Sequence, residues 1–398
     1  MTSDTIATQD SRGPGRPGPA TRSKKPHGGI MSGPVGRNMG LVIALAILCA
    51  VGVISAGDRF LDADNAITIL RSAAVIGVVS IGMTFVIIGG GIDLSVGALV
   101  ALSSVWATTL ATQAMAQDFH WIVIVITAVA VGAVGGLING IVIAYGKVAA
   151  FIATLAMLAS ARGLAEIISN RRTQILEQRD HRGFYDVFAG DVLGIPTLVI
   201  IFVVVAVAGW VLLNRTTFGR RTFAVGGNAE AARLAGIRVQ RHTMWLYVLS
   251  GIACGIAAAM LIGRTTTGSS THGTLYALDA IAAVVIGGTL LIGGRGTIVG
   301  TVLGVLIFTT LGNVFTLNGL SSSAQAVARG VIIVLAVLLQ QRVAAGGFRR
   351  RRLAGGTTSV AANPPTTTPG SPAGEVSTNT TAPAVPEEGP RDTTNGSA

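Results

Sequence analysis

Charged residues are scarce in this sequence. Only 12% of its 398 residues are Asp, Glu, Lys or Arg, about half of the roughly 25% found in an average soluble domain. Apolar residues make up 50% of the chain, and the mean hydropathy is +0.65. A chain with so few charges cannot cover a water-facing surface. The composition therefore excludes a soluble globular enzyme and favours a membrane protein.

Residues for metal binding and catalysis are also scarce. The two cysteines, Cys49 and Cys254, lie in apolar runs, where neither a disulfide nor a metal site is expected. The five histidines fall in five separate polar segments, so no pair has the spacing of metal ligands. The Gly-x-x-x-x-Gly-Lys-Ser/Thr motif of phosphate-binding loops is absent as well. We expect no metal, cofactor or catalytic residue, so any ATP-driven step must be powered by another polypeptide.

Long apolar runs are abundant. A helix needs about 20 apolar residues to cross the hydrocarbon core of a bilayer. We therefore predict an all-α polytopic membrane protein with about ten transmembrane helices, although two segments end in glycine clusters and leave a count of eight or nine open. The first run has no small-residue cleavage pattern, so we expect it to be retained. The predicted segments are 38–57, 67–89, 97–116, 121–145, 148–167, 195–213, 243–264, 279–293, 297–316 and 324–341.

Both ends of the chain are polar. Residues 1–37 form an arm rich in Gly, Pro, Ser and Arg, and residues 343–398 form an arginine cluster followed by a Thr- and Pro-rich tail. Neither segment can bury a core, so both are expected to be disordered. They flank one membrane domain that covers residues 38–342 and contains a long polar loop at 214–242.

Positive charge is distributed unevenly between the two predicted sides. One side receives 20 of the 29 Lys and Arg residues, which lie in the first arm, the loop 214–242, the cluster after residue 341 and a few short loops. Lys and Arg concentrate on the cytoplasmic side of membrane proteins. We therefore expect an even number of spans with both termini in the cytoplasm. The net charge of +11 then reflects topology and contact with the lipid bilayer, and it implies no nucleic-acid partner.

A first glycine cluster interrupts the apolar pattern within residues 87–97. Three consecutive glycines end a helix, and the backbone groups they free are tolerated at membrane depth only inside protein or beside water. An ionisable residue, Asp93, follows and indicates a functional site by default. Capping of the helix that starts near Leu94 is the alternative, and both roles can hold together. The candidate residues here are Gly89, Gly90, Gly91, Asp93 and Ser95.

A second glycine cluster lies within residues 285–304. The stretch 283–288 loosely resembles 85–90, and both an internal repeat and ordinary close helix packing explain the similarity. Asp279 precedes the cluster at the start of a predicted segment, where it either complements the helix dipole or lies near a substrate vestibule. This cluster adds Asp279, Gly287 and Gly288 to the candidate transport path.

The polar loop 214–242 contains the pattern of a complete short helix. Asn228 suits the N-cap, Glu230 the first turn, Arg233 the last turn and Gly236 the C-terminal stop. Such a helix among arginines is suited to docking into a partner, and the alternative is a helix lying on lipid headgroups. The residues assigned to this element are Asn228, Glu230, Ala231, Arg233, Leu234 and Gly236.

Four stretches resemble, in order, the permease subunits of bacterial ATP-binding-cassette importers of the ribose, xylose, arabinose and galactose type. The resemblance spans about residues 40–341 and implies a type II importer-like permease fold in the bacterial inner membrane. It further implies a second permease copy, cytoplasmic ATPase domains that carry the ATP, and an extracytoplasmic sugar-binding protein. It assigns the helix at 228–236 to coupling with the ATPase. The stretches are 84–97, 226–237, 278–288 and 293–297.

The resemblance leads us to expect a permease that moves a pentose or hexose inward by alternating access and breaks no covalent bond. The family usually has an acid at the position of Ala277 and a serine at that of Leu290, so the sugar stays open. Two alternatives also stay open. One is an ion-coupled secondary transporter in which Asp93 exchanges a proton, and the other is a related permease for a nucleoside, a polyol or a furanose signal.

Overall fold

The computed structural model describes residues 34–335 and residue 338. The chain divides into two units, Met1–Gly346 and Gly347–Ala398, and every described residue belongs to the first. The expected disordered arms therefore lie outside the described residues, except that the first helix begins at Pro34. Those arms stay predictions.

The regular secondary structure of the described residues is helical apart from four two-residue strands, which confirms the all-α prediction. The helices are α1 (Pro34–Ala56), α2 (Asp58–Leu61), α3 (Ala63–Ile88), α4 (Val96–Ala107), α5 (Leu110–Asp118), α6 (Ile122–Ala144), α7 (Ala150–Ser169), α8 (Arg182–Phe188), α9 (Thr197–Arg215), α10 (Thr217–Gly227), α11 (Ala229–Leu234), α12 (Val239–Thr265), α13 (Tyr276–Ile286) and α14 (Ile298–Leu317). A further helix, Ser322–Leu335, follows α14. The strands form two antiparallel pairs, β1 (Gln174–Ile175) with β4 (Thr267–Gly268) and β2 (Asp191–Val192) with β3 (Ile195–Pro196).

Fewer helices than ten qualify as membrane spans by length and composition. Among the described residues, seven single helices qualify, and α4 with α5 makes an eighth that is bent by 57°. These eight match eight of the ten predicted segments. Of the other two, 279–293 is the short helix α13, which ends where Gly287 and Gly288 break it. The last, 324–341, is the helix Ser322–Leu335, and most of the rest of that segment lies outside the described residues.

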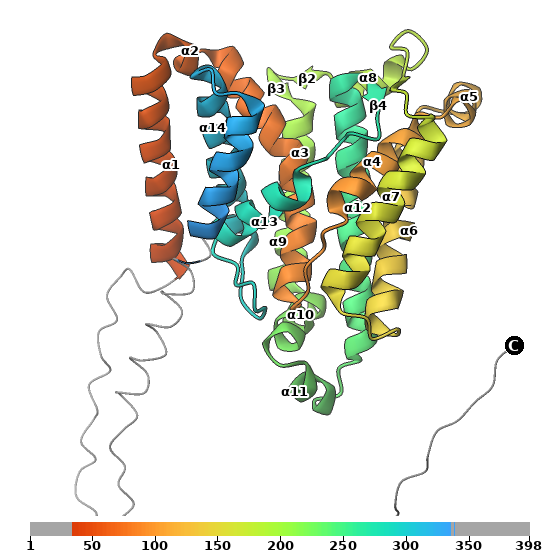
Figure 1. Cartoon of the computed structure of the whole chain (residues 1–398), viewed down its shortest axis with the longest axis vertical. Helices are drawn as coiled ribbons and strands as arrows, with labels where there is room; N and C mark the ends of the chain where they lie inside the picture. The colour runs from red at the N-terminus through yellow and green to blue at the C-terminus, as the bar shows by residue number, and fades with distance from the viewer. Residues whose placement is uncertain (1–33, 336–337, 339–398) are drawn as a thin grey trace, which may run out of the picture. The chain divides into compact units, whose positions relative to one another are not determined.

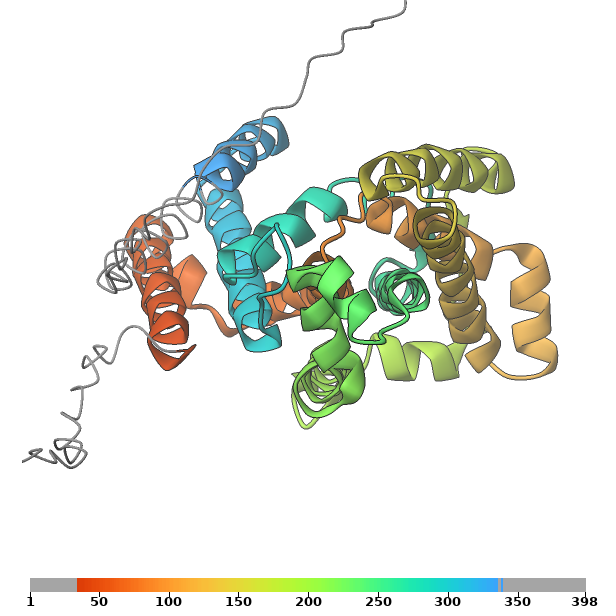
Figure 2. The ribbon, with the colours of Figure 1, turned by 90° about the horizontal axis from the view of Figure 1, so that it is seen from below.

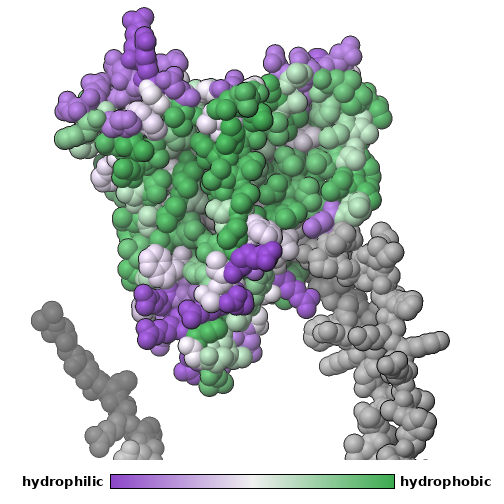
Figure 3. Space-filling model, turned by 180° about the vertical axis from the view of Figure 1, so that it is seen from behind, coloured by the Kyte–Doolittle hydropathy of each residue, from purple (hydrophilic) through white to green (hydrophobic). Residues whose placement is uncertain are grey.

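The helix ends gather at two opposite polar ends of this unit. α10 and α11 lie at one end together with the start of α1, and α2, α5 and α8 lie at the other (Figure 1). Between them, Figure 3 shows an apolar band across the rear face. This arrangement is typical of a membrane-spanning bundle, because lipid tails contact only apolar side chains.

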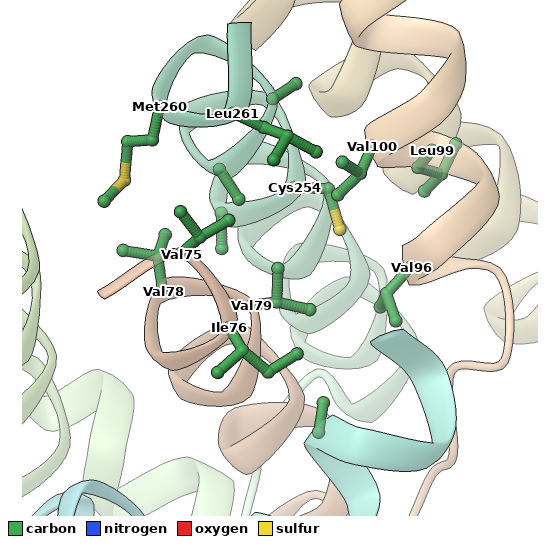
Figure 4. Close-up of a cluster of buried hydrophobic side chains, with 14 of the residues drawn as sticks. Val75, Ile76, Val78, Val79, Val96, Leu99, Val100, Cys254, Met260 and Leu261 are labelled. Carbon is green, nitrogen blue, oxygen red and sulfur yellow. The ribbon is translucent and has the colours of Figure 1, made fainter. Parts of the chain in front are cut away.

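Two helices form the centre of the bundle. α3 and α12 are the most buried of the spans, and α3 packs against α9, α12, α13 and α14. Their shared core is shown in Figure 4, where Val75 and Val79 of α3 and Val96 of α4 lie around Cys254 and Met260 of α12. Both cysteines have free thiols.

Small residues bring α12 unusually close to α6. A Cβ added at Gly136 of α6 would overlap the backbone at Tyr247, and one added at Gly251 of α12 would overlap the backbone at Gly132. Helices in lipid associate through such close backbone contacts, because lipid tails supply no hydrophobic driving force between them.

Candidate functional site

Two short helices begin in the interior of the bundle. α4 follows an irregular segment after Ile88. α13 follows the loop 266–275, which runs into the bundle from the end that carries α2, α5 and α8 (Figure 1). Their starts touch, because a Cβ on Gly97 would overlap the carbonyl group of Gly273, and Tyr276 lies beside it. Interrupted helices whose N-termini meet inside the membrane are typical of transport sites.

A closed polar network surrounds Asp93 just before α4. One carboxylate oxygen accepts the amide of Ser95 at 3.0 Å and its hydroxyl at 2.6 Å, and the other accepts the Ser250 hydroxyl at 3.0 Å. The amide of Asn139 donates to the Ser95 hydroxyl at 2.8 Å. All four side chains are buried. Hydrogen bonds to a carboxylate are among the stronger ones, so this network ties α4 to α6 and α12.

The Asp93 carboxylate accepts the amide of Ser95, the N-cap residue of α4, so Asp93 supports the start of this helix without being its N-cap. Its carboxylate has no exposure in this conformation, so a substrate contact stays a prediction. Sequence reasoning missed Asn139 and Ser250. Their signal was weak but present, since each is an isolated polar residue within an apolar, glycine-rich helix.

The second predicted acid, Asp279, is paired with a residue that sequence reasoning also missed. Arg329 of the helix Ser322–Leu335 lies 3.4 Å from its carboxylate, and both side chains are mostly buried. The Arg329 guanidinium also lies 5.6 Å from the ring centroid of Phe308. The pair fastens α13 to the helix after α14, which is a stronger structural role than complementing a helix dipole.

The two predicted glycine breaks share one backbone geometry. At the end of α3, Gly90 has φ +87° and the amide of Gly91 donates to the carbonyl of Val86. At the end of α13, Gly288 has φ +87° and the amide of Thr289 donates to the carbonyl of Val284. A left-handed residue that glycine supplies without strain ends each helix in this way. The resemblance between 85–90 and 283–288 thus extends to conformation.

The helix predicted in the polar loop is confirmed as α11. The side chain of Asn228 accepts the amide of Ala231 at 2.9 Å, and Gly236 has φ +83°. Glu230 bonds Arg233 one turn later, and this hydrogen bond lowers the pKa of the exposed Glu230 carboxyl. Leu234 is 79% exposed. The helix lies at the tip of one end (Figures 1 and 2). Its charged and apolar side chains are exposed there.

Sequence reasoning missed the helix α10, which carries α11. It begins where the Thr216 hydroxyl accepts the amide of Gly219, a threonine N-cap that the sequence did offer. α10 contacts α3, α9 and α12. Its position connects the exposed α11 to the centre of the bundle.

The end of α10 meets the glycine break after α3 and the later glycines of the second cluster in a contact that we call the glycine junction. It consists of Gly90, Gly226, Gly293 and Gly294. A Cβ on Gly226 would overlap the carbonyl oxygen of Ile88, and one on Gly293 would lie 2.9 Å from the Cα of Gly90. The amide of Gly294 donates to the same Ile88 carbonyl at 2.8 Å. The structure thus brings the first predicted break and the second glycine cluster together with α10, which leads into the predicted docking helix.

The described residues contain no group of three or more His, Cys, Asp or Glu side chains that could hold a metal ion. The site consists of helix breaks, buried polar networks and a protruding helix. It offers helix breaks at which the bundle can bend and a protruding helix that a partner can move.

Residues 65–338 match the family described as "Branched-chain amino acid transport system / permease component". The chain belongs to this permease family. The permease is 42% identical over 313 residues to the ribose import permease protein RbsC of Bacillus subtilis strain 168, which covers 78% of this chain and 94% of the relative. It is 40% identical over 294 residues to RbsC of Escherichia coli strain K12, covering 73% and 89%.

A third relative of the permease is the L-arabinose ABC transporter permease protein AraH of Azospirillum brasilense. The two are 37% identical over 295 residues, which covers 74% of this chain and 84% of the relative. No solved structure matches the permease. The resemblance to permease subunits of sugar importers is confirmed by these relatives.

Proposed function

We propose that this permease conducts a monosaccharide into the bacterial cytoplasm as the membrane subunit of an ATP-binding-cassette importer. The observation that carries the proposal is the similarity over nearly the whole membrane unit to ribose and arabinose permeases. Ribose is the first sugar to test, because the two ribose permeases share at least 40% of their aligned residues with this chain.

The proposed assembly contains two permease copies, two ATPase domains at the α11 end and a sugar-binding protein at the opposite end. The arginines of the loop 214–242 support a cytoplasmic position for α11 and for both termini. In the proposed cycle, ATP binding closes the ATPase pair and moves α11. The glycine junction passes that movement to α3 and to the segment after α13, and the bundle rocks between inward and outward openings.

An ATPase contact at α11 is supported by its geometry. The helix protrudes, is capped at both ends and carries exposed Glu230, Arg233 and Leu234 side chains. Two charges of opposite sign beside an exposed apolar side chain suit a protein groove better than an anionic lipid surface, which would favour basic residues alone.

The test is reconstitution of the permease with its ATPase and binding protein in proteoliposomes. We expect uptake of radiolabelled ribose to require ATP. Uptake driven by a proton gradient without ATP would instead support the ion-coupled alternative. Uptake of a nucleoside or a polyol but of no monosaccharide would reassign the substrate within the same family.

Charge reversal at α11 tests the coupling role separately. Glu230→Lys replaces the ion pair with Arg233 by repulsion, so we expect ATP-driven uptake to be lost while the variant still inserts in the membrane. Gln240→Lys is the matched control, because it adds a lysine to an exposed position at the same end outside α11. Equal uptake by the Glu230→Lys variant and the wild type would contradict the assignment.

A further inference from the structure

The loop between β4 and α13, residues 269–275, is rich in hydroxyl groups although it lies within the bundle. It contains Ser269, Ser270, Thr271 and Thr274. The loop runs along α4, since Gly268 packs against Ser104 and Thr108 at one end of that helix and Gly273 packs against Gly97 at the other. The 12 residues of α4 span about 18 Å, more than half of the roughly 30 Å of a hydrocarbon core. The loop therefore descends to membrane depth.

Arg162 fixes the backbone of this loop. It lies within the span α7, and one guanidinium nitrogen donates to the carbonyls of both Ser270 and His272. His272 bonds the Ser104 hydroxyl of α4 at 3.1 Å through its ring nitrogen. A charged side chain inside a membrane span marks a functional site by default. Here it holds a non-helical segment rigid between α4 and α7.

The fixed loop leaves polar groups uncovered. Thr271 and Thr274 are exposed, and Arg162, Ser270 and His272 are partly exposed. Irregular backbone and hydroxyl groups at membrane depth are stable only where protein covers them or where they line a water-filled path. No described residue covers the side chains of Thr271 and Thr274. They therefore face water or another protein chain rather than lipid tails.

We infer that the loop 269–275, with Arg162, lines the aqueous path and binds the hydroxyl groups of the transported sugar. This inference rests on the proposed function and adds the residues that contact the transported sugar. The Thr274 hydroxyl donates to the Thr271 carbonyl and the Thr271 hydroxyl bonds that of Ser269, so both oxygens can still accept from sugar hydroxyls. The guanidinium of Arg162 supplies donors. A neutral polyhydroxylated solute matches such a set.

Accessibility of introduced thiols tests the aqueous position. In a parent with Cys49→Ser and Cys254→Ala, the variants Thr271→Cys and Thr274→Cys are treated with a charged, membrane-impermeant methanethiosulfonate. We expect them to react about tenfold faster than Val134→Cys, an exposed apolar position in the middle of α6, because only thiols in water ionise readily. Equally slow reaction at all three positions would overturn the inference.

Removal of the hydroxyls tests the sugar contact. Thr271→Val and Thr274→Val keep the side-chain shape, and each is expected to lower ATP-driven ribose uptake about fivefold, the effect of one lost hydrogen bond in the transport step. The control is Thr309→Val on α14, whose hydroxyl bonds only the backbone of its own helix. Unchanged uptake by both loop variants would overturn the sugar contact.

These results separate the inference from the proposed function. If the parent permease takes up ribose but the loop thiols do not react, the inference fails and the proposed function stands. If the parent takes up no monosaccharide, the proposed function fails. Thiol reactivity then still decides whether the loop lines water.

Discussion

The backbone amide of Gly294 donates a hydrogen bond of 2.8 Å to the carbonyl oxygen of Ile88. This bond joins the segment after α13 to the end of α3, across 206 residues of sequence, and Gly226 of α10 packs against the same carbonyl. The contact consists of backbone alone. It leaves no room for a side chain at Gly226 or Gly293, so a change at either glycine disturbs all three segments together.

Gly226→Ala is therefore expected to impair the permease, because its Cβ would overlap the Ile88 carbonyl oxygen. Overpacking of this kind costs about 1–3 kcal/mol of stability. We expect a lower unfolding temperature in detergent and reduced ATP-driven uptake. Gly227→Ala is the matched control, since a Cβ there meets nothing within 4 Å. If the two alanine variants behave alike, the glycine junction has no special role.

Asp93→Asn is expected to destabilise the bundle. The carboxylate accepts three hydrogen bonds from Ser95 and Ser250, and an amide presents one donor group where an acceptor is needed. A buried polar group left without a partner costs about 1–3 kcal/mol. The unfolding temperature in detergent measures the loss, with Asp118→Asn at an exposed helix end as control. Wild-type stability and uptake for the Asp93→Asn variant would show that the network is dispensable.

Arg329→Gln is expected to leave the Asp279 carboxylate without its cation. Removing one partner of a fully buried ion pair costs about 3–5 kcal/mol of folding stability. We expect Arg329→Gln to cost about 2 kcal/mol, because both side chains of this pair keep some exposure. The double variant Asp279→Asn, Arg329→Gln removes both charges and should recover most of the stability. Thermal unfolding of the single and double variants measures this coupling, and an additive loss would contradict it.

His181 predicts a pH dependence of stability at the α8 end. Its ring is buried, which lowers its pKa below the ordinary value of 6.5, while nearby Asp180 partly offsets the shift. The folded state therefore binds the proton less readily than the unfolded state does. The stability that the neutral ring gives is fully present above pH 6.5 and is lost as the pH falls below it.

Unfolding temperatures at pH 7.5 and pH 5.5 in detergent measure this dependence. We expect His181→Gln to reduce the difference between the unfolding temperatures at the two pH values, because the variant lacks the group whose protonation favours unfolding. His120→Gln, at an exposed position, is the control. The same difference for wild type and His181→Gln would assign the pH dependence to other groups.

The features predictable from the sequence are those that neighbours along the chain decide. Apolar length located eight spans correctly, because crossing a bilayer requires only enough consecutive apolar residues. The cap at Asn228 and the stop at Gly236 were predictable because both act within one helical turn. The breaks at Gly89 and Gly287 followed from glycine's ease in ending a helix.

Contacts between distant segments were not predictable in this way. Ser250 reaches Asp93 across 157 residues, and Arg329 reaches Asp279 across 50. Contacts at such sequence separations produce no periodic pattern from which they could be predicted. The short helix α13 looked like a span because its apolar residues continue past the glycines that end it.

By itself, the sequence determined a polytopic helical membrane protein with two glycine breaks and one capped short helix, since each follows from local composition. Only the tertiary structure decided that the two glycine clusters meet the end of α10 and that a hydroxyl-rich loop descends beside α4. The physical reason is that close backbone approach and a buried polar network require several segments in place at once. Such arrangements depend on how the whole bundle packs, and many sequences with the same apolar pattern would pack differently.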